Sequence, residues 1–149
     1  MRKTVPFLLA ASLCGCVAAG RPPDASGGRV DPSPVSPIPI PLALEEIITT
    51  GVRQRLQDSA SAKFGTMLAG ERTVNGHREI VVCGTVNART SSGAYGGDKP
   101  FAAKIYPDAG SAFELVAMAG DGPNAALQVG GICRAAGLSL PEAGRKAQP

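Results

Sequence analysis

The chain has 149 residues, of which 44% are hydrophobic and 18% charged, a balance typical of one small folded domain. Aromatic residues make up only 4% and tryptophan is absent, so we expect a core of aliphatic side chains. The formal net charge is +3; without Arg2 and Lys3, which stand in an expected leader, 13 basic residues face 12 acidic ones, a net of +1. A nearly neutral domain lacks the positive charge that nucleic-acid binding requires, so nucleic acid is not an expected partner.

The first residues have the pattern of a bacterial secretory leader. Two cations precede a short apolar run over residues 5–13, which is too short to cross a bilayer as a helix. The run ends in the sequence Leu-Cys-Gly-Cys at residues 13–16, which resembles a bacterial lipobox. The resemblance implies that residues 1–15 are a lipoprotein signal peptide, cut off between Gly15 and Cys16.

The lipobox resemblance also implies that Cys16 carries a diacylglyceryl group and an acylated amino terminus. Two or more acyl chains hold a protein stably at a membrane. Val17 stands where an aspartate would mark retention at the inner membrane in some sorting systems, so the outer membrane is favoured. We therefore expect a cell-envelope protein, lipid-anchored and facing the periplasm. The alternative is an ordinary secreted protein cut near Ala18 or Ala19.

Residues 16–41 are expected to form a lipidated, proline-rich tether. Proline fixes φ and donates no backbone hydrogen bond, so this segment should be extended and poorly packed. Two alternatives remain: residues 34–41 could lie against the domain, because apolar residues alternate with the prolines there, or the segment could be a PxxP-type ligand.

Residues 42–140 are expected to form an α+β domain that begins with a helix. Apolar residues recur every four positions from Leu44 to Leu56, acidic residues lie near the start and arginines towards the end, as the helix dipole favours. A strand over residues 63–74 follows, then Asn75-Gly76, the strongest short hairpin signal. The returning strand, residues 78–88, is apolar on both faces, which predicts a central position in the sheet.

Two further strands and a helix complete the expected domain. The strands cover residues 101–106 and 112–119, with a turn at residues 108–110 between them. A helix is expected to end at Ala136, although Gly130 and Gly131 lower its intrinsic stability. We expect residues 141–149 to be a disordered tail. The predicted fold is therefore an N-terminal helix, an antiparallel four-stranded sheet and a C-terminal helix.

With Cys14 removed and Cys16 lipidated, Cys83 and Cys133 are the only cysteines left to pair. Disulfides persist outside the cytoplasm, so we predict that these two are bonded and fasten the last helix to the central strand. The alternatives are a redox-active pair and two free buried thiols. Redox sites usually have a CxxC spacing or a cysteine at a helix start, and neither pattern occurs at these positions.

The sequence offers little material for catalysis. His77, the only histidine, directly follows the predicted turn, where a surface position is more common than a catalytic one. Gly120, Gly122 and Ala125 have the spacing of a dinucleotide-binding turn, but too few residues follow them for a complete βαβ unit. We therefore predict no enzyme activity, no cofactor and no metal ion.

The loop over residues 91–99 is the one place where a ligand or partner is expected to bind. Its glycines let a backbone approach another surface closely, and Tyr95 offers a large contact area. We take Asn87, Tyr95, Gly96 and Gly97 as candidate contact residues. The simpler interpretation is that the glycines only let a long connection fold over the sheet.

Several short motifs resemble those of a family of small, uncharacterised exported proteins of proteobacteria, and the resemblance covers about residues 50–105. The motifs lie at residues 56–58, 61–65, 83–88 and 96–101. The chain departs from the family pattern at Ser59, where many members have proline, and at residues 94–97. The resemblance implies a shared domain but supplies no active site.

Together these observations predict a membrane-anchored envelope lipoprotein whose domain is a non-catalytic structural or interaction module. An envelope protein is its possible partner, besides the membrane that Cys16 would enter. The alternative is a periplasmic small-ligand binder or enzyme that uses the loop at residues 91–99.

Overall fold

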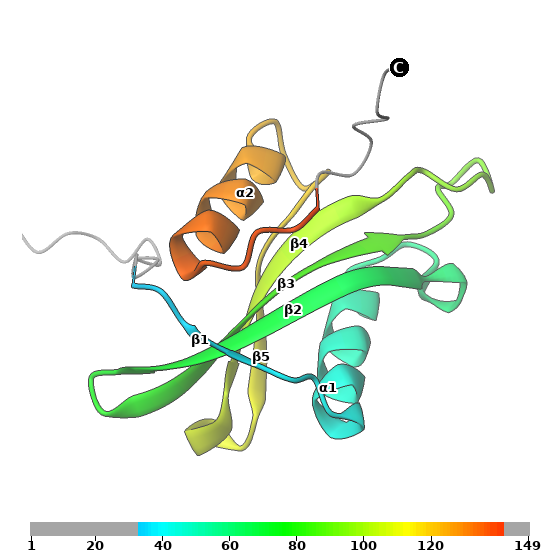
Figure 1. Ribbon diagram of the computed structural model, residues 1–149. Helices are drawn as coiled ribbons and strands as arrows, with labels where there is room; N and C mark the ends of the chain where they lie inside the picture. Colours follow the sequence, from blue (N-terminus) through cyan, green and yellow to red (C-terminus); the bar gives the residue numbers. More distant parts are fainter. Residues whose placement is uncertain (1–32, 142–149) are drawn as a thin grey trace, which may run out of the picture.

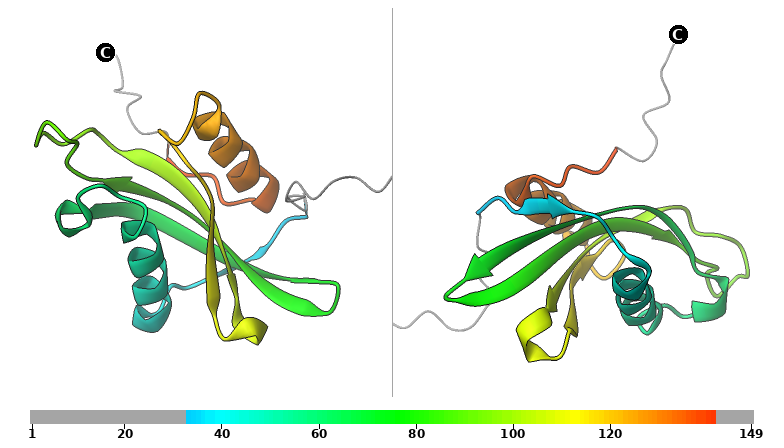
Figure 2. Two further views of the ribbon diagram at one scale, coloured as in Figure 1. Left: turned by 180° about the vertical axis from the view of Figure 1, so that it is seen from behind. Right: turned by 60° about the horizontal axis from the view of Figure 1, so that its bottom comes forward.

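The computed structural model describes residues 33–141, which form a single antiparallel sheet between two helices (Figure 1). The sheet has five strands in the order β1-β2-β3-β4-β5. Helix α1 lies on one face and α2 on the opposite face, so the domain has three layers (Figure 2). The predicted α+β class, with an N-terminal and a C-terminal helix, is confirmed.

The elements follow the predicted order closely. A short 3-10 helix, η1, precedes the long hairpin, and a second one, η2, precedes the last strand. The bounds are β1 Ser36–Ile38, α1 Leu42–Arg53, η1 Ser59–Ser61, β2 Lys63–Val74, β3 His77–Asn87, β4 Lys99–Tyr106, η2 Pro107–Ala109, β5 Ala112–Met118 and α2 Ala125–Ala136.

The prediction of four strands was wrong, because the tether segment contributes a fifth. Strand β1 pairs antiparallel with residues 69–71 of β2. Proline is tolerated there because β1 is an edge strand. Val35 is buried beside Gly70, where any side chain would overlap it, and the Val35 N–H donates to the Ala136 carbonyl at 3.1 Å. The alternative that residues 34–41 lie against the domain is therefore what the structure has.

Strand β3 is the central strand, as its apolar sequence predicted. Ile80, Val82 and Val86 face α1 and belong to the core on that side. Val81 and Cys83 face α2 and belong to the second core. Because successive strand residues point to opposite faces, one strand supplies both cores.

The β2–β3 hairpin closes at Asn75-Gly76 with φ values of 52° and 83°. Positive φ at both central positions is the type I′ geometry that this dipeptide predicts. The register then places Arg72 opposite Glu79. This hairpin turn and the η2 connection lie at the same end of the sheet, which we call the hairpin end (Figure 1).

Helix α1 buries Leu44, Ile48 and Val52 against the sheet, which is the predicted apolar stripe. It ends at Arg53, one turn earlier than the stripe suggested, and Leu56 packs on the core from the following turn. Gly51 allows the close approach of the Phe113 ring from β5.

Helix α2 is fastened to β3 by the Cys83–Cys133 disulfide, which joins residues 50 positions apart with a Cα–Cα distance of 6.0 Å. The predicted pairing is confirmed. Gly137 in the left-handed conformation ends the helix, and the Leu138 N–H donates to the Cys133 carbonyl at 2.8 Å. Leu138 is thereby buried in the core under α2.

Several predictions concern parts of the chain outside the described residues. These are the signal peptide at residues 1–15, the lipidation of Cys16, the tether as far as residue 32 and the tail from residue 142.

Candidate functional site

The predicted contact loop is an ordered small hairpin that extends β3 beyond the sheet (Figure 1). Arg89 and Tyr95 form an isolated antiparallel bridge. The Thr90 N–H donates to the Ala94 carbonyl at 2.8 Å, and the Gly93 N–H donates to the Thr90 carbonyl at 2.8 Å. The loop therefore has its own hydrogen bonds, although residues 89–98 are all exposed.

Contacts with η1 brace this loop from the side. The Arg89 N–H donates to Ser61 Oγ at 2.9 Å, and that hydroxyl donates to the Asp58 carbonyl at 2.9 Å. The Tyr95 hydroxyl donates to the Ser61 carbonyl at 3.4 Å. Two cations approach the Tyr95 ring, Lys63 Nζ at 4.5 Å and Arg89 Cζ at 5.5 Å from its centre. Tyr95 therefore stabilises the loop through these contacts and also forms part of its exposed surface.

The other candidate contact residues have different surroundings. Gly97 has a φ of 89°, a conformation that favours glycine, and Gly96 lies close to Thr90, so its Cβ would stand 3.0 Å from Thr90 Cγ2. Asn87, the last residue of β3, is half-buried. Its Oδ1 is fully buried and accepts no hydrogen bond within the described part of the chain.

A basic pocket of about 230 Å³ lies beside the loop. Its lining comes from the segment after α1, the loop, the start of β4 and the turn after β5, at the end of the sheet opposite the hairpin end. We call this the loop end. The charged lining residues are Arg55, Arg89, Lys99 and Asp121; Leu56, Gln57, Ala88, Thr90, Met118 and Gly120 complete the lining.

The three cations of the basic pocket have no ion-pair partner among residues 33–141. Lys99 Nζ lies over Gly120, 3.3 Å from where a Cβ would stand. Sequence analysis missed this pocket because its charged residues are far apart in the chain. The turn residues after β5, which were weighed only as a dinucleotide-binding turn, gave no sign of a basic site.

A second pocket, of about 390 Å³, lies under α2 next to the disulfide. Much of its lining is apolar and comes from Pro100, Val129, Cys133 and Leu140. Arg134 contributes a positive charge. Loop residues 88–98 do not reach it.

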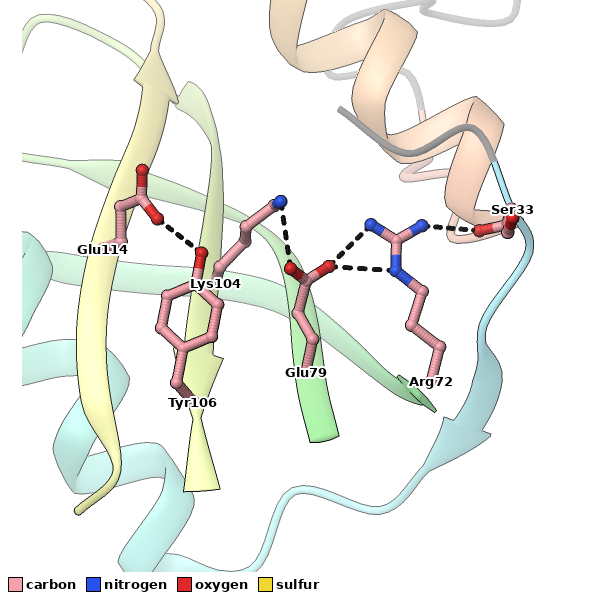
Figure 3. A network of polar contacts seen from close by, with 6 residues as sticks. All are labelled: Ser33, Arg72, Glu79, Lys104, Tyr106 and Glu114. Carbon is pink, nitrogen blue, oxygen red and sulfur yellow. Dashed lines mark hydrogen bonds and ion pairs between the residues drawn. The ribbon is translucent and has the colours of Figure 1, made fainter. Parts of the chain in front are cut away.

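The hairpin end contains a charge network that the sequence analysis missed (Figure 3). Glu79 is buried and accepts from Arg72 Nε at 2.9 Å and from Lys104 Nζ at 3.0 Å. Arg72 also donates to the Ser33 carbonyl at 2.8 Å. The network therefore joins β2, β3 and β4 to the residues that precede β1.

Tyr106 and Glu114 lie beside this network (Figure 3). The Tyr106 hydroxyl donates to Glu114 Oε2 at 2.6 Å. Burial raises the pKa of Tyr106 well above its usual range, and the neighbouring carboxylate adds to the shift because it opposes a second negative charge.

A third pair at the same end ties η2 to the start of β3. The Arg78 N–H donates to Asp108 Oδ2 at 2.8 Å, and Arg78 Nε donates to Oδ1 at 3.1 Å. These hydrogen bonds lower the pKa of Asp108, because they favour its ionised form. His77, beside them, is exposed, which agrees with the surface position expected for it.

The glycines that have the spacing of a dinucleotide-binding turn belong to an ordinary connection. Gly120 and Gly122 form a turn between β5 and α2, and the described chain has no strand after α2. Between residues 33 and 141 no three His, Cys, Asp or Glu side chains are placed to hold a metal ion. No helix of that region is long and apolar enough to cross a membrane.

In comparisons with known proteins, no family model, curated protein or solved structure matches the chain.

Proposed function

We propose that this protein is a lipid-anchored lipoprotein of the cell envelope, whose periplasmic domain is a non-catalytic structural or interaction module. In this proposal residues 1–15 direct export and Cys16 carries the lipid, with the outer membrane favoured by Val17. The domain meets an envelope partner through the loop end.

The observation that carries this proposal is the disulfide between Cys83 and Cys133. Structural disulfides are rare in reducing compartments, so the bond supports a location outside the cytoplasm. The lipobox-like sequence at residues 13–16 supports membrane attachment independently of the fold.

The course of the chain supports the role of the loop end. Register places Ser36 opposite Glu71 and Ile38 opposite Ala69, so β1 runs from the hairpin end towards the loop end. The charge network holds Ser33, where the described chain begins. The exposed loop of residues 89–98 projects from the opposite end, where its ordered backbone is free to meet a partner (Figure 2).

Mass spectrometry of the membrane fraction tests the anchor. We expect an amino-terminal peptide that begins at Cys16 and carries the mass of a diacylglyceryl group and an added acyl chain. Cys16→Ala should abolish lipidation, whereas Cys14→Ala, the matched control, should leave it intact. An unlipidated protein that begins near Ala18 or Ala19 would contradict the proposal.

The basic pocket favours a second candidate function, a small-ligand binder at the loop end. Binding sites are typically concave, with a few polar groups that converge on the ligand. The pocket next to residues 88–90 has that form. A fragment screen by NMR tests this candidate: fragments that bind should shift the amides of Ala88, Arg89 and Gly120. If no fragment shifts them, the pocket does not bind small ligands.

A further inference from the structure

The basic pocket concentrates positive charge from distant parts of the chain. Arg55 follows α1, Arg89 belongs to the loop, and Lys99 begins β4. Asp121 is the one acidic residue in the lining, so three positive charges face one negative charge. A concave surface with an excess of one charge raises the local concentration of counter-ions.

These cations differ from those at the hairpin end. There, Arg72, Arg78 and Lys104 each contact a carboxylate at 3.1 Å or less. Within residues 33–141 the pocket cations contact no carboxylate. Like charges brought together repel one another, and a bound anion would remove that repulsion.

Two of the three pocket cations, Arg89 and Lys99, are also held in position before any ligand arrives. The backbone of Arg89 is bonded to Ser61, and its guanidinium lies near the Tyr95 ring. Lys99 is fixed in the sheet opposite Val86, and its side chain lies along Gly120. Groups that are already ordered lose less conformational entropy on binding.

The size and charge of the pocket restrict the ligand. Its volume of about 230 Å³ is below the range of about 300–1,000 Å³ typical of sites for drug-sized molecules. It therefore fits one compact group. Arginine binds planar and tetrahedral oxyanions through paired N–H donors, and an excess of two positive charges matches a dianion better than a carboxylate.

We propose that the basic pocket binds a phosphate-type dianion through Arg55, Arg89 and Lys99. This inference rests on the second candidate function, because it names the ligand class of that same pocket. It does not depend on lipidation. The phosphate group could be free or could belong to a lipid headgroup, and the two sources call for separate titrations.

The test is an NMR titration of the full chain in detergent at constant ionic strength, kept with sodium chloride. One titration uses inorganic phosphate, and the other uses glycerol 3-phosphate, a soluble phosphomonoester headgroup that carries a dianionic phosphate group. We expect saturable shifts of the Ala88, Arg89 and Gly120 amides with one of them. The double variant Arg55→Gln/Lys99→Gln should weaken that binding more than about tenfold, because two charge-assisted contacts are lost.

Arg53→Gln is the matched control, because Arg53 lies at the end of α1 outside the pocket lining and its loss changes the net charge of the same region. It should weaken binding less than about twofold. Arg89→Gln provides an independent variant if the double variant does not fold.

Saturable binding of phosphate supports a free ligand, and binding of glycerol 3-phosphate alone supports a lipid headgroup. Absence of binding in both titrations would overturn the inference, and so would an equal loss in Arg53→Gln. If neutral fragments shift the pocket amides while neither phosphate compound does, the small-ligand function stands and only the ligand class is wrong.

Discussion

At the hairpin end of the sheet, Arg72, Arg78 and Lys104 are each paired with a carboxylate, whereas the cations of the basic pocket at the loop end have no ion-pair partner within the described residues. The two ends share one sheet and similar residue types. Glu79 is surrounded by Arg72 and Lys104, which leaves little charge for a ligand. Arg55, Arg89 and Lys99 have no such partner. The difference indicates that charge stabilises the fold at the hairpin end, and it supports our proposal that the loop end binds a ligand.

Removal of the disulfide, which fastens α2 to the central strand, should have the largest effect on the stability of the domain. Closing a loop of 50 residues stabilises a protein by about 4 kcal/mol through the lost entropy of the unfolded chain. The variant Cys83→Ala/Cys133→Ala should therefore lose about that much free energy of unfolding in urea. A loss below about 1 kcal/mol would show that the bond contributes little.

The only two tyrosines of the chain, Tyr95 and Tyr106, lie one at each end. Fluorescence of Tyr95→Phe and of Tyr106→Phe therefore reports the unfolding of each end separately. We expect the same urea midpoint for both ends in the disulfide-bonded protein. Different midpoints would mean that the ends unfold independently.

Glu79→Ala should have the next largest effect, because it leaves the positive charges of Arg72 and Lys104 buried without a carboxylate between them. Breaking a buried ion pair costs about 3 kcal/mol or more. The exposed Glu46 on α1 is the control, and Glu46→Ala should change the free energy of unfolding by about 0.5 kcal/mol or less.

Replacement of the whole cluster separates charge from packing. The triple variant Arg72→Met/Glu79→Leu/Lys104→Met should recover much of the stability that Glu79→Ala loses. A buried ion pair often stabilises a fold no more than apolar side chains of similar volume do. If the triple variant is as unstable as Glu79→Ala, the network stabilises the fold through its hydrogen-bond geometry and not through its charge balance.

Gly70→Ala should have a smaller effect, confined to the attachment of β1. A Cβ at residue 70 would overlap the Val35 side chain, and overpacking of this kind costs about 1–3 kcal/mol. Amide hydrogen exchange should accelerate at Ala69 and Glu71, which β1 covers. Gly122→Ala is the control, because a Cβ there meets no atom within 4 Å. Unchanged exchange in Gly70→Ala would mean that β1 adds no protection.

The smallest effect should appear as a pH dependence at the hairpin end. The pKa of Tyr106 is raised in the folded protein, so its neutral form is favoured there. The resulting stabilisation is fully present below the unfolded pKa of about 10 and is lost as the pH rises towards the folded value. Urea unfolding between pH 8 and 11 should show a steeper loss for the wild type than for Tyr106→Phe. Parallel curves would contradict this role.

Features that depend on neighbouring residues were predictable from the sequence. The Asn75-Gly76 turn requires positive φ, and the alternation along β3 assigns each residue to a face. The disulfide joins distant residues and could be predicted only because Cys83 and Cys133 had no other cysteine left to pair with.

Most features that depend on distant residues were missed. The alternation of apolar residues with prolines at residues 34–41 allowed packing against the domain, but the pairing of β1 with β2 was missed, because it depends on the space that Gly70 leaves for Val35. Arg72 and Glu79 are equally spaced about the hairpin turn, so their pairing could have been found from the register. The basic pocket could not, because its cations meet only after the sheet has formed.

Photo-cross-linking in intact cells tests most directly whether the loop end is the binding end. A photoreactive amino acid is placed at Ala94 in the loop or at Thr73 near the hairpin turn, both of which are exposed. Our proposal predicts a discrete cross-linked product with an envelope partner from position 94 and none from position 73. Products from position 73 alone, or equal products from both positions, would contradict it.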